Sequence, residues 1–214
     1  MKGLIELKKS GVVYLGKSKF LTLMRENLII VIFTLIFTFG VLCACLLFNY
    51  NHFENESDLL LNFFVQLRCE FNFLRLFVSS FFLSFIFLFL IYLFGTSLLG
   101  LAFVPFVLFV RGAISGLLLC GLYSEYSLTG IAVNLLTVIP STLISVLALI
   151  DASGHSLTLS YSLGKMIINE GQAYHKIDIK LILKKFCLHL FIITLGALFE
   201  AFMSFLFNRF LVLG

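Results

Sequence analysis

The chain has 214 residues, of which 61% are hydrophobic and only 12% are charged, and its formal net charge is +4. A soluble domain is nearer one-quarter charged because its surface must meet water, so this composition excludes an ordinary soluble fold. The mean hydropathy of +1.11 indicates instead a chain whose surface mostly faces lipid.

The first 27 residues form a basic segment in which lysines alternate with apolar residues. This pattern is typical of a segment that lies on an anionic membrane surface. A disordered basic flank is the alternative, because Gly3, Gly11 and Gly16 weaken any helix there. We treat residues 1–27 as a cytoplasmic or interfacial segment that precedes the membrane domain.

Five apolar runs follow, and each is long enough to cross a bilayer. The first, Leu28 to Phe48, has 21 residues without a charge, which span about 30 Å as a helix. The long apolar stretch after residue 75 needs a break, which we place at Gly95-Thr96-Ser97, and a short turn at 123–127 separates the next two runs. We predict an all-α polytopic bundle with one transmembrane domain over residues 28–208. Its spans are expected at about 28–48, 76–95, 98–122, 128–150 and 186–208, and the fourth helix is expected to continue toward Leu163.

The orientation of the bundle follows from its basic residues. Most lysines lie in the N-terminal segment and in residues 164–185, whereas the 49–62 connection is acidic. Five spans place the N-terminus and the lysine-rich segment in the cytoplasm and the acidic connection outside. Four spans with a re-entrant 98–122 would put those lysines outside, so we favour five.

Two charges, Arg111 and Glu200, lie deep in apolar runs. A charge in lipid is costly and is normally paired or turned toward the bundle interior. Both residues fall near the middle of spans that run in the same direction, so we predict that they lie at similar depth and form an ion pair. We favour a structural role for this pair over a transport or proton-relay role.

Small residues cluster after Arg111. Gly112 and Gly116 have the spacing that lets two helix backbones approach closely, and Gly121 continues the group. Ser115 raises a sharper alternative, an intramembrane serine protease that would use His155 or His189 as its base. The flanking residues do not support that alternative.

The remaining chemistry-bearing residues indicate no catalytic, cofactor or metal site. Asp151, Ser153 and His155 are three triad residue types, but on one helix their side chains diverge, so we read them as the polar cytoplasmic end of the fourth span. The four histidines lack metal-ligand spacing, and the sequence contains no phosphate-binding loop. We therefore expect no enzyme, no cofactor and no nucleic-acid partner.

The order of several short motifs resembles the stage II sporulation protein M family of bacterial membrane proteins. Each motif is individually weak, but their order and spacing match the family over roughly residues 25–208. Ser141, Thr142 and Ser145 stand where many family members carry polar or acidic groups, and Phe205 stands near the place of a common proline. The motifs are Phe39-Gly40-Val41, Phe94-Gly95 to Gly100, Val110-Arg111-Gly112, Ile139-Pro140 and Phe199-Glu200-Ala201.

The resemblance implies a multi-pass protein of the bacterial cytoplasmic membrane that works through partners. One implied role is a non-enzymatic scaffold that recruits or anchors cell-wall hydrolases during sporulation engulfment. The other is a membrane component of circular-bacteriocin maturation, export or immunity, with an ATPase and a peptide precursor as partners. The sequence leaves both roles open, along with oligomer formation. Four residues are expected to contribute to helix packing: Gly112, Gly116, Gly121 and Pro140.

Overall fold

The computed structural model describes residues 28–48, 73–168 and 179–211. The predicted basic segment 1–27 and the acidic 49–62 connection lie outside the described residues. A π-helical turn, η1 (Asn134–Val138), joins two of the helices. The helices are Leu28–Phe48, α3 (Phe73–Gly95), α4 (Gly100–Val133), α5 (Ile139–Ile168) and α6 (Ile179–Leu211).

Five helices in the described residues are long and apolar enough to cross a membrane. The predicted helical membrane bundle is therefore confirmed. A helix satisfies its own backbone hydrogen bonds, which is why apolar runs of this length adopt it in lipid. The third of these, Gly100–Gly121, has 22 residues and is long enough to span.

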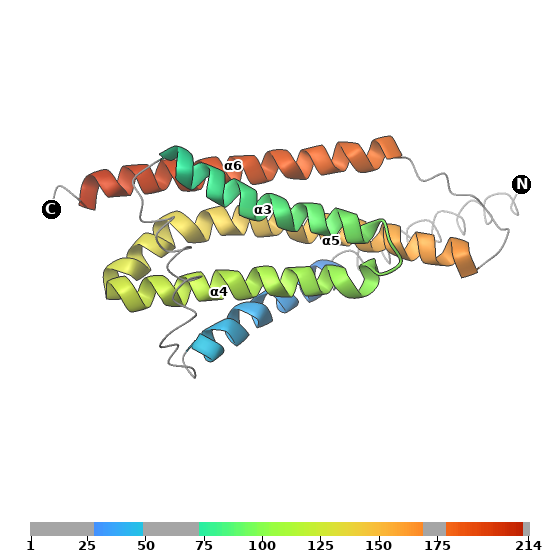
Figure 1. The fold of residues 1–214 in the computed structure, drawn as a ribbon, viewed down its shortest axis with the longest axis horizontal. Helices are drawn as coiled ribbons and strands as arrows, with labels where there is room; N and C mark the ends of the chain where they lie inside the picture. Colours follow the sequence, from blue (N-terminus) through green and yellow to red (C-terminus); the bar gives the residue numbers. More distant parts are fainter. Residues whose placement is uncertain (1–27, 49–72, 169–178, 212–214) are drawn as a thin grey trace, which may run out of the picture.

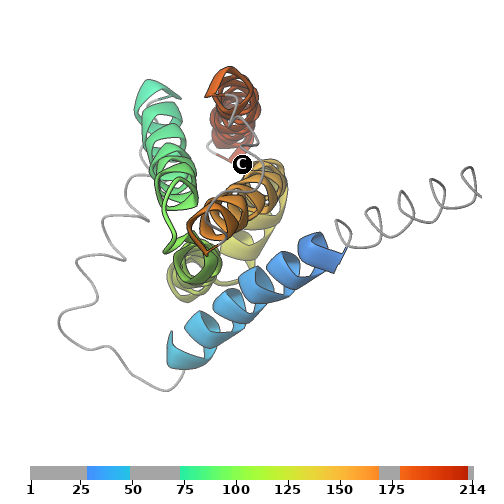
Figure 2. The same ribbon diagram turned by 90° about the vertical axis from the view of Figure 1, so that its right-hand side faces the viewer.

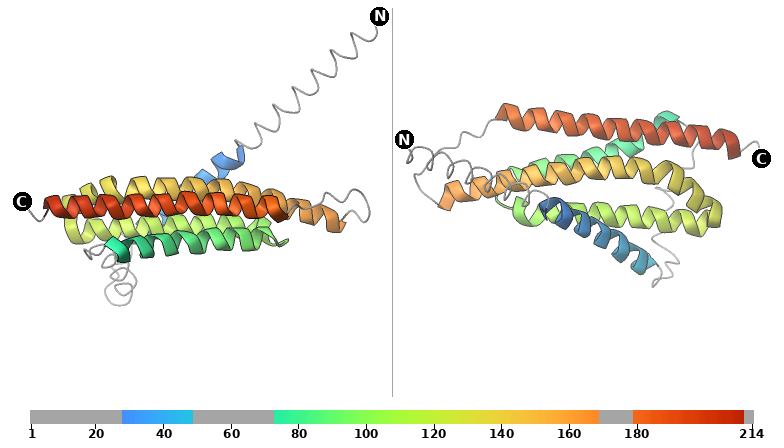
Figure 3. Two further views of the ribbon diagram at one scale, coloured as in Figure 1. Left: turned by 90° about the horizontal axis from the view of Figure 1, so that it is seen from above. Right: turned by 180° about the vertical axis from the view of Figure 1, so that it is seen from behind.

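Helices α3 to α6 lie side by side with alternating direction (Figures 1 and 3). Helix α3 packs against α4, α5 and α6, and α5 packs against α3, α4 and α6. Consequently α4 and α6 run in the same direction, as the span count requires. The Leu28–Phe48 helix crosses this group obliquely on the side of α4 (Figure 2).

The bundle core is made of aliphatic side chains that the helices contribute jointly. Leu88 and Ile91 from α3, Leu108 from α4, Leu149 from α5 and Ile193 from α6 have no exposed surface. Large apolar side chains also cover the outside, and Leu74, Leu147 and Phe191 are examples. An apolar interior with an apolar exterior is the pattern of a protein surrounded by lipid.

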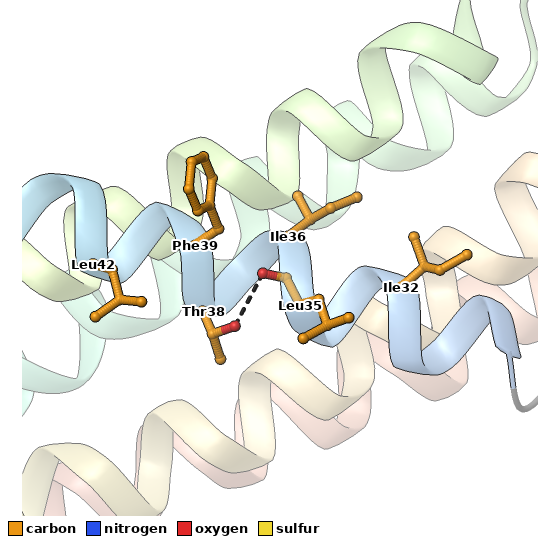
Figure 4. Close-up of a pocket in the computed structure, with 6 residues that line it drawn as sticks. All are labelled: Ile32, Leu35, Ile36, Thr38, Phe39 and Leu42. Atoms are coloured by element: carbon orange, nitrogen blue, oxygen red, sulfur yellow. Dashed lines mark hydrogen bonds between the residues drawn. The ribbon is translucent and has the colours of Figure 1, made fainter.

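The outer face of the Leu28–Phe48 helix shows the same character (Figure 4). An open hollow of about 480 Å³ lies along this face, and all of its lining residues belong to this helix: Ile32, Leu35, Ile36, Thr38, Phe39 and Leu42. The one hydroxyl among them, on Thr38, donates to the Leu35 carbonyl of its own helix at 2.9 Å. This face has no polar group that needs a partner, so acyl chains can fill the hollow.

The connection between the third and fourth spans differs from the prediction. Residues 123–127 are helical, and α4 continues to Val133 before the π-helical turn and α5. Pro140 gives a physical reason for that turn, because it has no N–H to donate to the carbonyl of Leu136. The chain therefore reverses direction through bent helix (Figure 1) rather than through a short loop at 123–127.

The other helix ends differ from the prediction less. Helix α3 ends at Gly95 and α4 begins at Gly100, which is where the sequence placed the break. Helix α5 runs to Ile168, through the serine-rich stretch and past Leu163. Helix α6 begins at Ile179 rather than 186, so part of the lysine-rich segment is helical.

Candidate functional site

Glu200 is held inside the bundle by two serines from different helices. Its side chain is 2% exposed. The hydroxyl of Ser80 on α3 donates to Glu200 Oε2 at 2.6 Å, and the hydroxyl of Ser141 on α5 donates to the same oxygen at 2.7 Å. These two short bonds join α6 to both neighbouring helices.

Ser141 lies at the start of α5, directly after Pro140, and is buried together with Thr137 of the preceding turn. Its short hydroxyl reaches Glu200 from the neighbouring helix.

Arg111 lies in the same interior and is also 2% exposed. Its Nη1 donates to Ser115 Oγ at 3.3 Å, and its guanidinium carbon lies 5.7 Å from the ring centroid of Phe87 on α3. Arg111 and Glu200 therefore both turn toward α3 from opposite sides of the bundle. Their burial agrees with the sequence analysis, and the ion pair between them stays a prediction.

Ser115, the nucleophile of the protease alternative, makes its described hydrogen bonds within its own helix. It donates to the Arg111 carbonyl at 3.0 Å and accepts from Arg111 Nη1. The two histidines proposed as its base lie in another polar cluster, described below. The structure thus places Ser115 with Arg111 and not with a histidine.

Glycines allow the Leu28–Phe48 helix to approach α4. A Cβ added to Gly112 would lie 2.3 Å from the Phe37 carbonyl oxygen, and one added to Gly116 would lie 2.6 Å from the Val41 carbonyl oxygen. Gly40, on the other helix, would meet the Phe109 carbonyl at 2.3 Å. Both backbones are therefore in direct contact, so glycine is required on both sides.

A face of small residues on α5 makes the corresponding contacts with the other helices. Gly95 on α3 and Gly100 on α4 pack against Ser156 and Ser160, and Gly196 on α6 packs against Ser145. Ser160 also donates to the Ser97 carbonyl at 2.7 Å, which fastens the α3–α4 turn to α5. The sequence analysis identified the glycines of α4 as packing residues but missed this face of α5. The spacing of the serines along α5 is the pattern that could have indicated it.

A second polar cluster joins α3, α5 and α6, and the sequence analysis also missed it. Asp151 Oδ2 lies 2.9 Å from His189 Nε2 and 3.7 Å from His155 Nε2. His189 Nδ1 lies 3.0 Å from the Tyr92 hydroxyl, and Lys185 Nζ lies 3.0 Å from His155 Nδ1. Asp151 and His155 therefore converge on a histidine from another helix, which corrects their interpretation as a simple polar helix end.

The sequence contains an indication of this cluster, because four of its residues form two pairs with helical spacing. Asp151 and His155 are four residues apart, as are Lys185 and His189, so each pair shares one helix face. Only the packing of α5 against α6 brings the two pairs together. In the described residues, no group of three or more histidine, cysteine, aspartate or glutamate side chains is arranged to hold a metal ion.

The fold and these contacts define a class of protein: a polytopic helical membrane protein whose helices are joined by buried polar groups and by close glycine contacts. The model of the family described as Stage II sporulation protein M matches residues 30–205, which is most of the chain, and the protein belongs to that family. The comparison with curated proteins gives no match, and neither does the comparison with solved structures.

Proposed function

We propose that this protein is a non-enzymatic membrane scaffold that recruits or anchors partner proteins, with cell-wall hydrolases acting during sporulation engulfment as the leading class of partner. The observation that supports the proposal is that buried polar groups within the family-matched region form hydrogen bonds between helices. Glu200, Ser80 and Ser141 bond across helices, and Ser160 bonds to the α3–α4 turn. Groups engaged in this way stabilise a fixed bundle.

The composition of the matched region supports the same proposal. Residues 30–205 consist of five membrane-length helices and the segments that connect them. Both connecting segments outside the described helices, 49–72 and 169–178, fall below the roughly 50 residues of a small folded domain. A partner would therefore meet helix faces and short connections rather than a separate soluble domain.

The test is purification of the tagged full chain from its native membranes after mild cross-linking, followed by identification of the proteins that accompany it. The scaffold proposal expects a cell-wall hydrolase or another envelope protein. Recovery of an ATPase together with a small peptide precursor would favour the bacteriocin-related role instead. Recovery of the chain alone in every mild detergent would contradict both.

A matched variant makes the test specific. Gly112→Leu should separate the Leu28–Phe48 helix from α4, because a Cβ alone would already meet the Phe37 carbonyl. Gly154→Leu is the control, because among the described residues an added Cβ at Gly154 would have one neighbouring atom within 4 Å, on the Ile29 side chain at 3.9 Å. If the partner recognises the assembled bundle, Gly112→Leu loses it and Gly154→Leu keeps it.

A further inference from the structure

Two cysteines from different helices lie against each other. Cys45 belongs to the Leu28–Phe48 helix and Cys120 belongs to α4. Both are free thiols and both are partly buried. Their side chains are in hydrogen-bond contact, and the Cys45 thiol also donates to the Gly116 carbonyl oxygen, with 3.8 Å between sulfur and oxygen. The structure thus holds a pair of thiols across a contact between two helices.

The register of the two helices explains why these thiols meet. The glycines of α4 bring the two backbones together at two successive points, and the residues in contact advance by four on both helices from one point to the next. Cys45 and Cys120 are the next step of the same series. Positions four apart share one helix face, so the glycine contacts direct both cysteines to the same interface. The three successive pairs are Phe37 with Gly112, Val41 with Gly116, and Cys45 with Cys120.

The backbone separation in this region suits a disulfide. A Cβ added to Gly116 would lie 3.1 Å from Val41 Cα. Because a bond from Cα to carbon is about 1.5 Å long, the Cα atoms of Gly116 and Val41 are less than about 5 Å apart. A disulfide requires two Cα atoms about 4.4 to 6.8 Å apart. One turn further along, the thiols of Cys45 and Cys120 are already in contact, so a bond between them needs a movement of two side chains and no rearrangement of the helices.

The pair lies near the end of both spans. Cys45 is three residues before Phe48, where the first span ends, and Cys120 is next to Gly121, where the third span ends. The predicted orientation places these ends at the outer side of the membrane, and disulfides form and persist in compartments outside the cytoplasm. We propose that Cys45 and Cys120 are a redox pair that closes to an interhelical disulfide.

The oxidant is a disulfide from outside the chain, which reacts by thiol–disulfide exchange. One cysteine gives up its thiol proton, and its sulfur attacks a sulfur of the oxidant to form a mixed disulfide. The leaving sulfur takes up the released proton. The second cysteine attacks the mixed disulfide in the same way, so two cysteine thiols and one oxidant disulfide give one interhelical disulfide and two new thiol groups. The cysteine pair loses two electrons and the oxidant gains them.

The first helix is the element that this disulfide fastens. Among the five spans in the described residues, Leu28–Phe48 has the smallest buried share, and it crosses the other helices obliquely beside α4 (Figure 2). A covalent bond to α4 removes the freedom of this helix to move away, and reduction of the bond restores that freedom.

The test uses the full chain in lipid nanodiscs with Cys45 and Cys120 as its two cysteines, after Cys43→Ser, Cys69→Ser and Cys187→Ser. Oxidised glutathione is the probe, and alkylation with intact-mass spectrometry then counts the free thiols. The proposal expects a monomeric chain that loses both free thiols, carries no glutathione and regains both thiols on reduction. The unchanged chain, treated in the same way, should yield a digest peptide in which residues 45 and 120 are joined.

A matched chain with Cys43 and Cys120 is the control, and it carries Cys45→Ser in place of Cys43→Ser. Residues two apart on a helix are turned by about 200° from each other, so Cys43 does not share the face of Cys45. This chain should keep free thiols or carry glutathione instead of closing. A stable glutathione adduct or two unreacted thiols in the Cys45–Cys120 chain overturns the proposal. Equal closure in the matched chain overturns it too, because the reaction would then not depend on the contact between Cys45 and Cys120.

Discussion

Glu200 and Arg111 are buried charges in an apolar bundle, and their surroundings differ. Glu200 Oε2 accepts two hydroxyl bonds from neighbouring helices, whereas the guanidinium of Arg111 lies near the Phe87 ring and bonds Ser115 of its own helix. In lipid a charge without such contacts would cost several kcal/mol. At the scale of single residues, the interior of this protein is organised by where its few polar groups can be satisfied.

The predicted Arg111–Glu200 ion pair is testable by a double-mutant cycle with Arg111→Gln and Glu200→Gln. If the residues pair, each single change leaves a buried charge uncompensated, and the double variant loses less stability than the sum. A coupling energy of about 0.5 to 3 kcal/mol is expected for contacting buried groups. The measurement is the free energy of unfolding of the four detergent-purified chains, from denaturant titrations. Additive losses would contradict the pair.

Ser141→Ala should destabilise the bundle, because it removes one of the two hydroxyl bonds to Glu200 Oε2. Interhelical hydrogen bonds in membrane proteins contribute about 0.6 kcal/mol on average and at most about 2 kcal/mol, so a small fall in melting temperature is expected. Thr142→Val is the matched control, because its hydroxyl bonds the Ile139 carbonyl of its own helix. Equal effects of the two substitutions would show that the Glu200 bond does not contribute.

At the scale of helices, two kinds of small residue make close packing possible. Glycines on α4 and on the Leu28–Phe48 helix bring two backbones into contact, and serines on α5 meet glycines on α3, α4 and α6. Apolar attraction between helices is weak in lipid, because acyl chains are as apolar as leucine. Close backbone approach and interhelical hydrogen bonds therefore contribute much of the free energy of helix association.

Gly112→Ala should weaken the attachment of the Leu28–Phe48 helix, because the added Cβ would lie 2.3 Å from the Phe37 carbonyl oxygen. Gly154→Ala is the control, because among the described residues its Cβ would meet a single atom within 4 Å, on the Ile29 side chain at 3.9 Å. Alanine favours a helix over glycine by about 1 kcal/mol, so Gly154→Ala should be neutral or stabilising. Thermal stability in detergent measures both variants, and a tolerated Gly112→Ala would contradict the close approach.

At the scale of the whole molecule, the alternating helices bring the described lysines together at one end of the bundle. Lys165, Lys180, Lys184 and Lys185 lie where α5 ends and α6 begins, which is also the end of the α3–α4 turn (Figure 1). The excess of positive charge on cytoplasmic loops then predicts that this end faces the cytoplasm. The opposite end holds the start of α3 and the bend between α4 and α5.

This orientation predicts a labelling pattern for single cysteines in a background without the five native ones. Phe73→Cys, at the start of α3, should react with a membrane-impermeant maleimide added to intact cells. Thr96→Cys, in the α3–α4 turn, should react only after the membrane is permeabilised. The reverse pattern would invert the topology, and labelling of both from outside would contradict the span count.

The sequence by itself determined the membrane class, the five helices, the break at Gly95 and the burial of Arg111 and Glu200, because these follow from local composition and from the cost of polar groups in lipid. Only the tertiary structure showed which side chains meet. Residues 123–127 read locally as a turn, yet the helix continues through them to the bend before Pro140.

The contacts of Asp151 with His189 and of Ser141 with Glu200 depend on how α5 and α6 are rotated and staggered against each other. Rotation and stagger are set jointly by all the packed helices. A pattern along one helix predicts which of its residues share a face, but only the assembled bundle decides which face of the neighbouring helix they meet.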